Sequence, residues 1–165
     1  MSGTIADNTG LDSGAIVAAG GAGKLLAMET VTNNTRTSLS ATTTWVSVIS
    51  AVYTKTSATS DLIVSCTVPM FDDSADAQDV GLTDGSTVIL GAWYANSNHS
   101  FHKMSYTIAN FGTLGAASHT ISWGYRSAGG SAMPAVYINP NATDDPTYGR
   151  MTQYHTTFVF SEVEA

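Results

Sequence analysis

The sequence predicts an all-β fold: an antiparallel, jelly-roll-like β-sandwich of about eight strands, preceded by an extended N-terminal arm. Three observations predict it. From Lys24 onward, short segments rich in β-branched and aromatic residues recur at regular spacing. Clusters of Gly, Asn, Pro and Ser separate these segments and favour turns. No long stretch has the period of an amphipathic helix, and only residues 74–80 favour a short helical turn.

The strand segments follow one another along the chain after the arm. Residues 45–53 form a long run of alternating side chains that is rich in β-branched residues. Pro69 is expected to end the strand that begins at Asp61, because proline cannot donate to a ladder. The segment 83–86, Thr-Asp-Gly-Ser, predicts a turn. The expected strands are residues 25–30, 45–53, 61–68, 88–94, 101–111, 119–127, 135–139 and 156–163.

Two of the expected strands, at residues 45–49 and 157–160, are apolar on both faces. In an isolated antiparallel sandwich one face of each sheet is wetted and polar. The pattern therefore indicates that the outer face of one sheet is covered, as in a trimer with sandwiches around an axis. A central strand under a long loop explains the same pattern and stays open as an alternative.

The chain divides into an arm, residues 1–23, and a sandwich domain, residues 24–165. The arm ends in a Gly/Ala-rich run and has neither a helical nor a strand period. An isolated arm of this kind has little structure of its own, so a neighbouring subunit is expected to order it. Its apolar side chains are the expected partner-binding residues: Ile5, Leu11, Ile16 and Val17.

Composition points to assembly with protein partners. Ser and Thr together number 42, whereas charged residues are only 12% of the chain. Surfaces poor in long charged side chains are typical of proteins that pack against copies of themselves or a partner. A low-charge monomer remains the alternative.

The net charge of −7 disfavours nucleic acid and anionic membranes as partners. The single cysteine, Cys66, lies in an apolar run and is expected to be a small buried hydrophobe. The N-terminus has no signal-peptide pattern, so we expect synthesis in a reducing cytosol and a soluble product.

The motifs tested for catalysis are weak, and we expect a protein that is not an enzyme and has no cofactor. Residues 20–25, Gly-Gly-Ala-Gly-Lys-Leu, lack the first Gly and the Ser or Thr of a phosphate-binding loop. No Gly-x-Ser-x-Gly elbow occurs. Trp45 and Trp123 are expected in the core, whereas one ring of the pair Trp93-Tyr94 is expected to face outward.

Metal sites are also not expected. An acidic loop could hold Ca²⁺ through oxygen ligands, but its spacing is not that of an EF-hand, and a solvated loop is favoured. The four histidines lack the further ligands of a zinc site. The acidic residues are Asp72, Asp73, Asp76 and Asp79, and the histidines are His99, His102, His119 and His155.

Seven segments carry a family resemblance that covers nearly the whole chain. They are GKLLAM (23–28), TRTSLS (35–40), SDLIVS (60–65), DGSTVILG (84–91), SHTISWGYRS (118–127), VYINP (136–140) and FVFSEV (158–163). In these the chain resembles small virion structural proteins of tailed bacteriophages, especially marine phages and cyanophages. The resemblance implies a jelly-roll sandwich, usually a trimer, used as a capsid decoration or a tail-fibre tip. It implies no catalytic residues.

Among these roles we favour a trimeric capsid decoration (cement) protein that binds the major capsid protein and stabilises the shell. The chain, taken as whole, has no coiled coil or fibre repeat ahead of the sandwich. We expect it on the capsid surface of the virion, after synthesis in the bacterial host cytoplasm. The alternatives are a tail-fibre tip that recognises host surface glycans and, third, a glycan-acting enzyme.

Overall fold

The computed structural model describes residues 24–40, 42–72, 77–94, 101–127, 136–140 and 155–165. These residues form strands, turns and connections, with no helix among them. The arm, with Ile5, Leu11, Ile16 and Val17, lies outside the described residues. The strands are β1 (Leu25–Asn33), β2 (Thr37–Leu39), β3 (Val46–Thr54), β4 (Ser60–Asp72), β5 (Ala77–Thr83), β6 (Val88–Tyr94), β7 (Phe101–Thr113), β8 (Ser118–Ser127), β9 (Val136–Ile138) and β10 (Thr156–Glu164).

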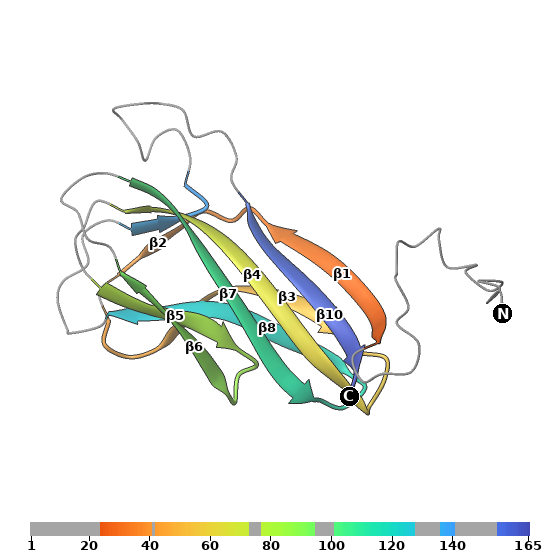
Figure 1. Ribbon diagram of the computed structural model, residues 1–165. Helices are drawn as coiled ribbons and strands as arrows, with labels where there is room; N and C mark the ends of the chain where they lie inside the picture. The colour runs from red at the N-terminus through yellow and green to blue at the C-terminus, as the bar shows by residue number, and fades with distance from the viewer. Residues whose placement is uncertain (1–23, 41, 73–76, 95–100, 128–135, 141–154) are drawn as a thin grey trace, which may run out of the picture.

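The strands form two antiparallel sheets that face each other (Figure 1). Sheet A runs β1-β10-β4, and β7 pairs with the other edge of β4. The short strands β9 and β2 continue sheet A beyond the start of β10, where β9 pairs with the end of β4. Sheet B runs β3-β8-β5-β6.

The connections between the long strands identify the topology. Successive long strands alternate between the sheets, and β5 and β6 are the consecutive pair that stays in one sheet. Two four-stranded sheets connected in this way make a jelly roll. The prediction of an all-β antiparallel sandwich is confirmed.

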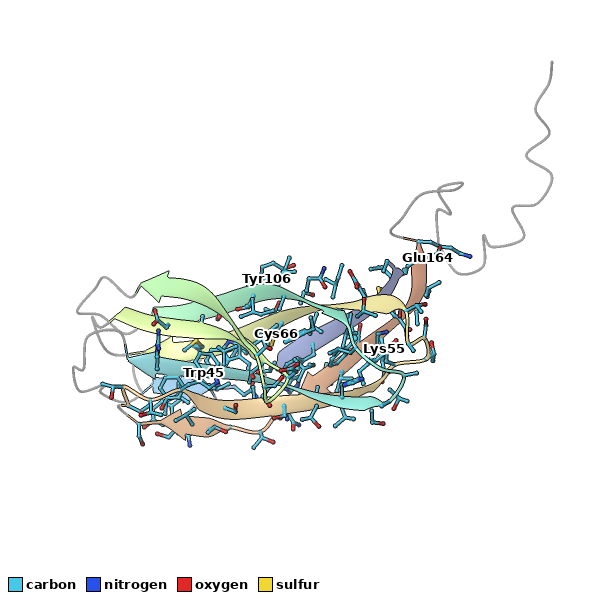
Figure 2. The ribbon with its side chains drawn as sticks, turned by 90° about the horizontal axis from the view of Figure 1, so that it is seen from below. Trp45, Lys55, Cys66, Tyr106 and Glu164 are labelled. Carbon is cyan, nitrogen blue, oxygen red and sulfur yellow. The ribbon has the colours of Figure 1, made fainter. Side chains whose placement is uncertain are left out.

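The core lies between the sheets and follows the two-residue period of each strand. On β4 the inward side chains are Leu62, Val64, Cys66 and Val68, all fully buried. Phe158 of β10 packs beside them in the same core. Figure 2 shows Cys66 between the layers, and burial raises the pKa of its thiol. Cys66 is thus the small buried hydrophobe that the sequence predicts.

The prediction that Pro69 ends a strand is wrong, because β4 continues to Asp72. The carbonyl of Pro69 accepts a hydrogen bond of 3.0 Å from the backbone N–H of Asn139. In a strand, the nitrogen of a residue faces the same side as its carbonyl. The position of the missing N–H therefore faces the gap between β10 and β9 along one edge of β4. The pairing with β10 reaches Thr67, and the pairing with β9 begins at Met70. No ladder bond is lost there.

The short helical turn expected over 74–80 is also wrong in its described part, because β5 begins at Ala77. Pairing on both edges fixes β5: Val80 lies opposite Gly91 of β6 and Tyr125 of β8. The turn at 83–86 is confirmed. The Asp84 carboxylate accepts hydrogen bonds from the N–H groups of Ser86 and Thr87, and Gly85 supplies the positive φ of 94°.

Trp45, expected in the core, is only half-buried. A β-bulge between Ser47 and Ile49 breaks the alternation of β3, so residues before the bulge do not continue the inward parity. The ring of Trp45 instead lies against Gly124. Trp123, by contrast, is fully buried as predicted.

Replacing Gly124 with Ala should destabilise the fold by about 1–3 kcal/mol, because overpacking forces the backbone to move. The new Cβ would lie 2.5 Å from the backbone oxygen of Val46 and 2.7 Å from the Trp45 ring. Chemical denaturation of the variant measures the loss. Gly115→Ala is the matched control, since a Cβ there meets nothing within 4 Å. Equal stability of the two variants would contradict the packing.

Candidate interaction surface

The carboxylate of Glu162 on β10 is fully shielded from solvent. It accepts hydrogen bonds from the Tyr53 hydroxyl at 3.1 Å and the Ser60 hydroxyl at 2.6 Å. The backbone N–H groups of Thr56 and Ser57 donate to it at 3.1 and 2.7 Å. Hydrogen bonds to a carboxylate favour its charged form. The group therefore anchors the β3–β4 connection to the last strand.

Two effects oppose each other at this carboxylate. Burial raises the pKa of Glu162, but the hydrogen bonds from Ser60, Thr56 and Ser57 outweigh it and lower the pKa from 4.5 to about 2. Lys55, also buried, lies with its Nζ 4.0 Å from the carboxylate and donates to the Ser60 hydroxyl at 2.7 Å. Burial and the hydrogen bond to Glu162 raise the pKa of Tyr53 to about 12. Each polar group here is used in holding the chain together.

Asn139 is a second polar anchor, at the end of β9. Its side-chain amide donates to the carbonyls of Asn33 and Thr35 at 2.9 and 3.0 Å. Its side-chain oxygen accepts from the N–H and hydroxyl of Thr156 at 2.8 and 2.9 Å. A φ of 49° sets this geometry, and asparagine tolerates it better than most residues. The side chain thus joins the connection between β1 and β2 to the first residue of β10.

The outer face of sheet A is the most apolar exposed surface among the described residues. Its edge strands carry large exposed side chains: Met28 on β1 is 64% exposed, and Tyr106 and Ile108 on β7 are 63% and 56% exposed. Figure 2 shows Tyr106 on the outside of the sandwich. The outward positions of the face, from β1 to β7, are Met28, Thr30, Thr32, Val163, Ser161, Val159, Thr157, Asp61, Ile63, Ser65, Thr67, Asn110, Ile108 and Tyr106.

The middle of strand β7 has an inverted polarity. There the inward side chains, Ser105 and Thr107, are small and polar, whereas Tyr106 and Ile108 face outward. Farther along the strand, Phe111 packs against the core. The hydroxyls of Ser105 and Thr107 are buried without a hydrogen-bond partner among the described residues. Burying an unpaired hydroxyl costs free energy. The strand therefore places two large apolar side chains, Tyr106 and Ile108, outside the sandwich.

The outer face of sheet B differs. Its exposed hydroxyls satisfy one another across β3 and β8: Ser50 with Ser122 and Thr54 with Ser118, each at 2.8 Å. Val52, 55% exposed, lies between these pairs. The ion pair of Arg126 with Asp79, at 2.8 Å, lies on the same sheet. Three polar pairs thus link neighbouring strands on the outer face of sheet B.

A depression of about 290 Å³ opens beside β2 and β3. The Tyr125 hydroxyl in its wall donates to the carbonyl of Ser40 and accepts from the Ser40 N–H. Residues 37–40, Thr42, 46–48 and Tyr125 line it. Hydroxyl and aliphatic groups dominate this lining, so it offers no arrangement for acid–base chemistry.

The acidic, histidine and aromatic residues singled out in the sequence do not come together in one site among the described residues. Of the acidic loop, Asp73 and Asp76 lie outside the described residues, as does the side chain of Asp72, and Asp79 pairs with Arg126. His119 contacts the carbonyl of Gly115 at 2.8 Å, and His155 is exposed. His99 and the side chains of His102, Trp93 and Tyr94 are outside the description. Across the described ranges, no three His, Cys, Asp or Glu side chains gather as metal ligands.

Comparison with known proteins gives similarity to solved structures only. No family model matches the chain, and no curated protein matches it. It is similar to a structure of infectious bursal disease virus, Gt strain, with 18% identity and a TM-score of 0.38. It is also similar to the VP2 subviral particle of that virus, with 15% identity and a TM-score of 0.42. Each match covers 84% of this chain, which spans about 38% of the length of those chains. In the described part of the chain, no helix is long and apolar enough to cross a membrane.

Replacing Glu162 with Gln should lower the free energy of unfolding at pH 7 by about 2–4 kcal/mol, since the buried donors lose their acceptor charge. The folded-state pKa of about 2 lies below the ordinary 4.5, so this carboxylate stabilises the fold above pH 4.5. That contribution disappears as the pH falls from 4.5 toward 2. Chemical denaturation at several pH values between 4.5 and 2 measures the effect. The free energy of unfolding should change less with pH for E162Q than for the unaltered chain. Glu164→Gln, which removes an exposed carboxylate two residues away, is the control and should leave the free energy of unfolding at pH 7 nearly unchanged.

Proposed function

We propose that this chain is a virion structural protein of a tailed bacteriophage, a homotrimer that decorates the capsid and stabilises the shell by binding the major capsid protein. The proposal includes a virion location on the capsid surface and synthesis in the bacterial host cytoplasm. It also includes a purely structural role, without catalysis. The jelly roll is compatible with this role, but a fold alone does not specify a function.

One observation carries the proposal: the outer face of sheet A is almost free of charge. Among the described outward side chains of β1, β10, β4 and β7, Asp61 is the one that is charged, and Thr113 donates a hydrogen bond to it at 3.0 Å. Where β9 continues the sheet, Arg36 lies over the ring of Tyr137. Interface cores are depleted of charged residues and enriched in aromatic and large apolar ones. A face with exposed Tyr106 and Ile108 and hydroxyl-bearing neighbours fits burial in an assembly.

The two parts of the chain support two tasks in this proposal. The sandwich supplies self-association, and residues 1–23, with Ile5, Leu11, Ile16 and Val17, supply attachment to the shell. A protein that binds only the assembled shell stabilises that state by mass action. The net charge of −7 agrees with a protein partner rather than packaged nucleic acid.

A tail-fibre tip that binds host glycans is the second candidate, favoured by the exposure of Tyr106. An aromatic ring that is 63% exposed can pack against a sugar ring. Binding of the isolated chain to a glycan array would favour this candidate, and loss of that binding on chelation would implicate Ca²⁺. Density for the chain at the tail in a cryo-EM map of the virion would exclude the decoration role.

Deleting residues 1–20 should leave the sandwich folded, because the strands of both described sheets lie within residues 25–164. The deletion should abolish binding to capsids, because residues 1–23 are the proposed attachment segment. The test mixes full-length and truncated chains with expanded capsids of the virus that encodes the chain, and cryo-EM measures the occupancy. Circular dichroism and the melting temperature check the fold of the truncated chain. Full occupancy by the truncated chain would refute attachment through the arm.

A further inference from the structure

We propose that the free edge of β3 is a docking site for residues 11–19 of the same chain, which would add to sheet B as an extra strand. The inference goes beyond the proposed function, because it concerns the isolated chain. It gives residues 11–19 a binding site on their own sandwich, and it holds or fails whichever partner these residues contact on a particle.

Strand β3 has an edge that is open to strand addition. It pairs with β8 on one side and has no strand partner on the other among the described residues. Charged side chains, proline, bulges and short length are the features that usually block such an edge. β3 has nine residues and neither a charge nor a proline, and its bulge leaves the run from Ile49 to Thr54 regular. Its unpaired backbone groups can therefore accept another strand.

The start of β3 leaves an apolar side chain uncovered on the core side. Val46 lies opposite Tyr125, and residues opposite each other in an antiparallel pair face the same side of the sheet. Tyr125 is 2% exposed, whereas Val46 is 40% exposed. Val46 lines the depression of about 290 Å³, together with Leu39 and Val48. An apolar side chain placed in this depression would be removed from water, which is favourable.

The described chain starts at the end of the sandwich where β3 ends. Residues 1–23 join the sandwich at Lys24, which directly precedes β1. Near the start of β1, Ala27 lies opposite Glu162, and Glu162 accepts a hydrogen bond from Tyr53 near the end of β3. β1 and β3 also contact each other along this side of the sandwich. The free edge of β3 is therefore within reach of the segment that precedes Lys24.

The length of that segment matches the edge. If residues 20–23, Gly-Gly-Ala-Gly, reverse the direction of the chain, the nine residues 11–19 can span the nine residues of β3. Leu11 then lies beside Val46, where its side chain can enter the depression. Asp12 has the opposite parity and would face water. Because the segment would run in the same direction as β3, the pairing would be parallel.

A cysteine pair tests the docked position. In Leu11→Cys/Val46→Cys, mild oxidation of the dilute chain should link the two cysteines within one molecule, as mapped by mass spectrometry of the digested chain. Leu11→Cys/Val88→Cys is the matched control and should stay reduced over the same time. Val88 is 41% exposed, like Val46, but lies on β6 at the opposite edge of sheet B. Cys66 is fully buried and does not compete.

Three outcomes of this test would overturn the proposal. Equal linking of both pairs would mean that the segment has no preferred site on the sandwich. Absence of the link between positions 11 and 46 would mean that the segment does not reach the depression. Covalent dimers as the main product would mean that the segment binds another copy.

Hydrogen exchange tests the pairing without altering the sandwich. Leu11→Asp should remove the protection of those β3 amide N–H groups that do not bond to β8, because it places a carboxylate in an apolar depression. Nuclear magnetic resonance measures the exchange rates. Ile5→Asp is the matched control and should leave these rates unchanged, since position 5 lies beyond the start of β3 in the proposed alignment.

Identical exchange rates in the unaltered chain and in L11D would also overturn the docking site. Both tests use the isolated chain, whereas binding to capsids tests the proposed function. Failure of one proposal is therefore distinguishable from failure of the other.

Discussion

The buried carboxylate of Glu162 is the constraint on which one end of the sandwich depends. Glu162 belongs to sheet A, and its hydrogen-bond donor Tyr53 belongs to sheet B, so this bond ties the two layers together. The Tyr53 ring also stacks on Phe160 at 5.1 Å. An ionised carboxylate in an apolar interior is costly unless donors surround it. The β3–β4 connection has to fold back over Glu162 to bring its N–H groups into range, and that requirement fixes the connection. Asn139 imposes a similar requirement where β10 begins.

These two polar anchors lie at the two ends of β10. They hold the connections in place without any contribution from the outer faces of the sheets. Sheet B uses its surface hydroxyls in cross-strand pairs, such as Ser50 with Ser122. On the outer face of sheet A, Thr113 donates a hydrogen bond to the Asp61 carboxylate across β7 and β4, and Met28, Tyr106 and Ile108 are exposed. The two faces are built from similar amino acids, but the larger exposed apolar side chains lie on sheet A. This difference is the basis for the proposal that sheet A is covered in an assembly.

The sequence predicted the strands whose own side chains favour an extended conformation. It did not predict the strands whose conformation depends on pairing with neighbouring strands. The β-branched run of β3 and the Asp84-Gly85 turn carry local signals. β5 does not, since Ala77–Thr83 has weak strand propensity and takes its conformation from neighbours on both edges. The prediction that Pro69 ends the strand was wrong, because β4 accommodates a proline at the gap between two partner strands, β10 and β9. These partners are distant in sequence from Pro69. Glu162, near the end of the chain, has the pattern of a solvated terminal charge, and only the fold reveals the donors around it.

The sequence did not predict the exposure of Tyr106 and Ile108, for a related reason. In β7 the alternation places Tyr106 and Ile108 on one parity and Ser105 and Thr107 on the other, and the usual expectation assigns the larger apolar parity to the core. The fold does the reverse. For an isolated chain this orientation has two costs in free energy. It exposes two large apolar side chains to water, and it buries two hydroxyls that have no hydrogen-bond partner among the described residues. A one-residue shift of register would exchange the two parities, but it would also turn Phe111, which packs against the core, outward. β4 and β7 pair over nearly their whole length in the observed register. Burial of the outer face in an assembly, as proposed above, would offset part of the cost of this orientation.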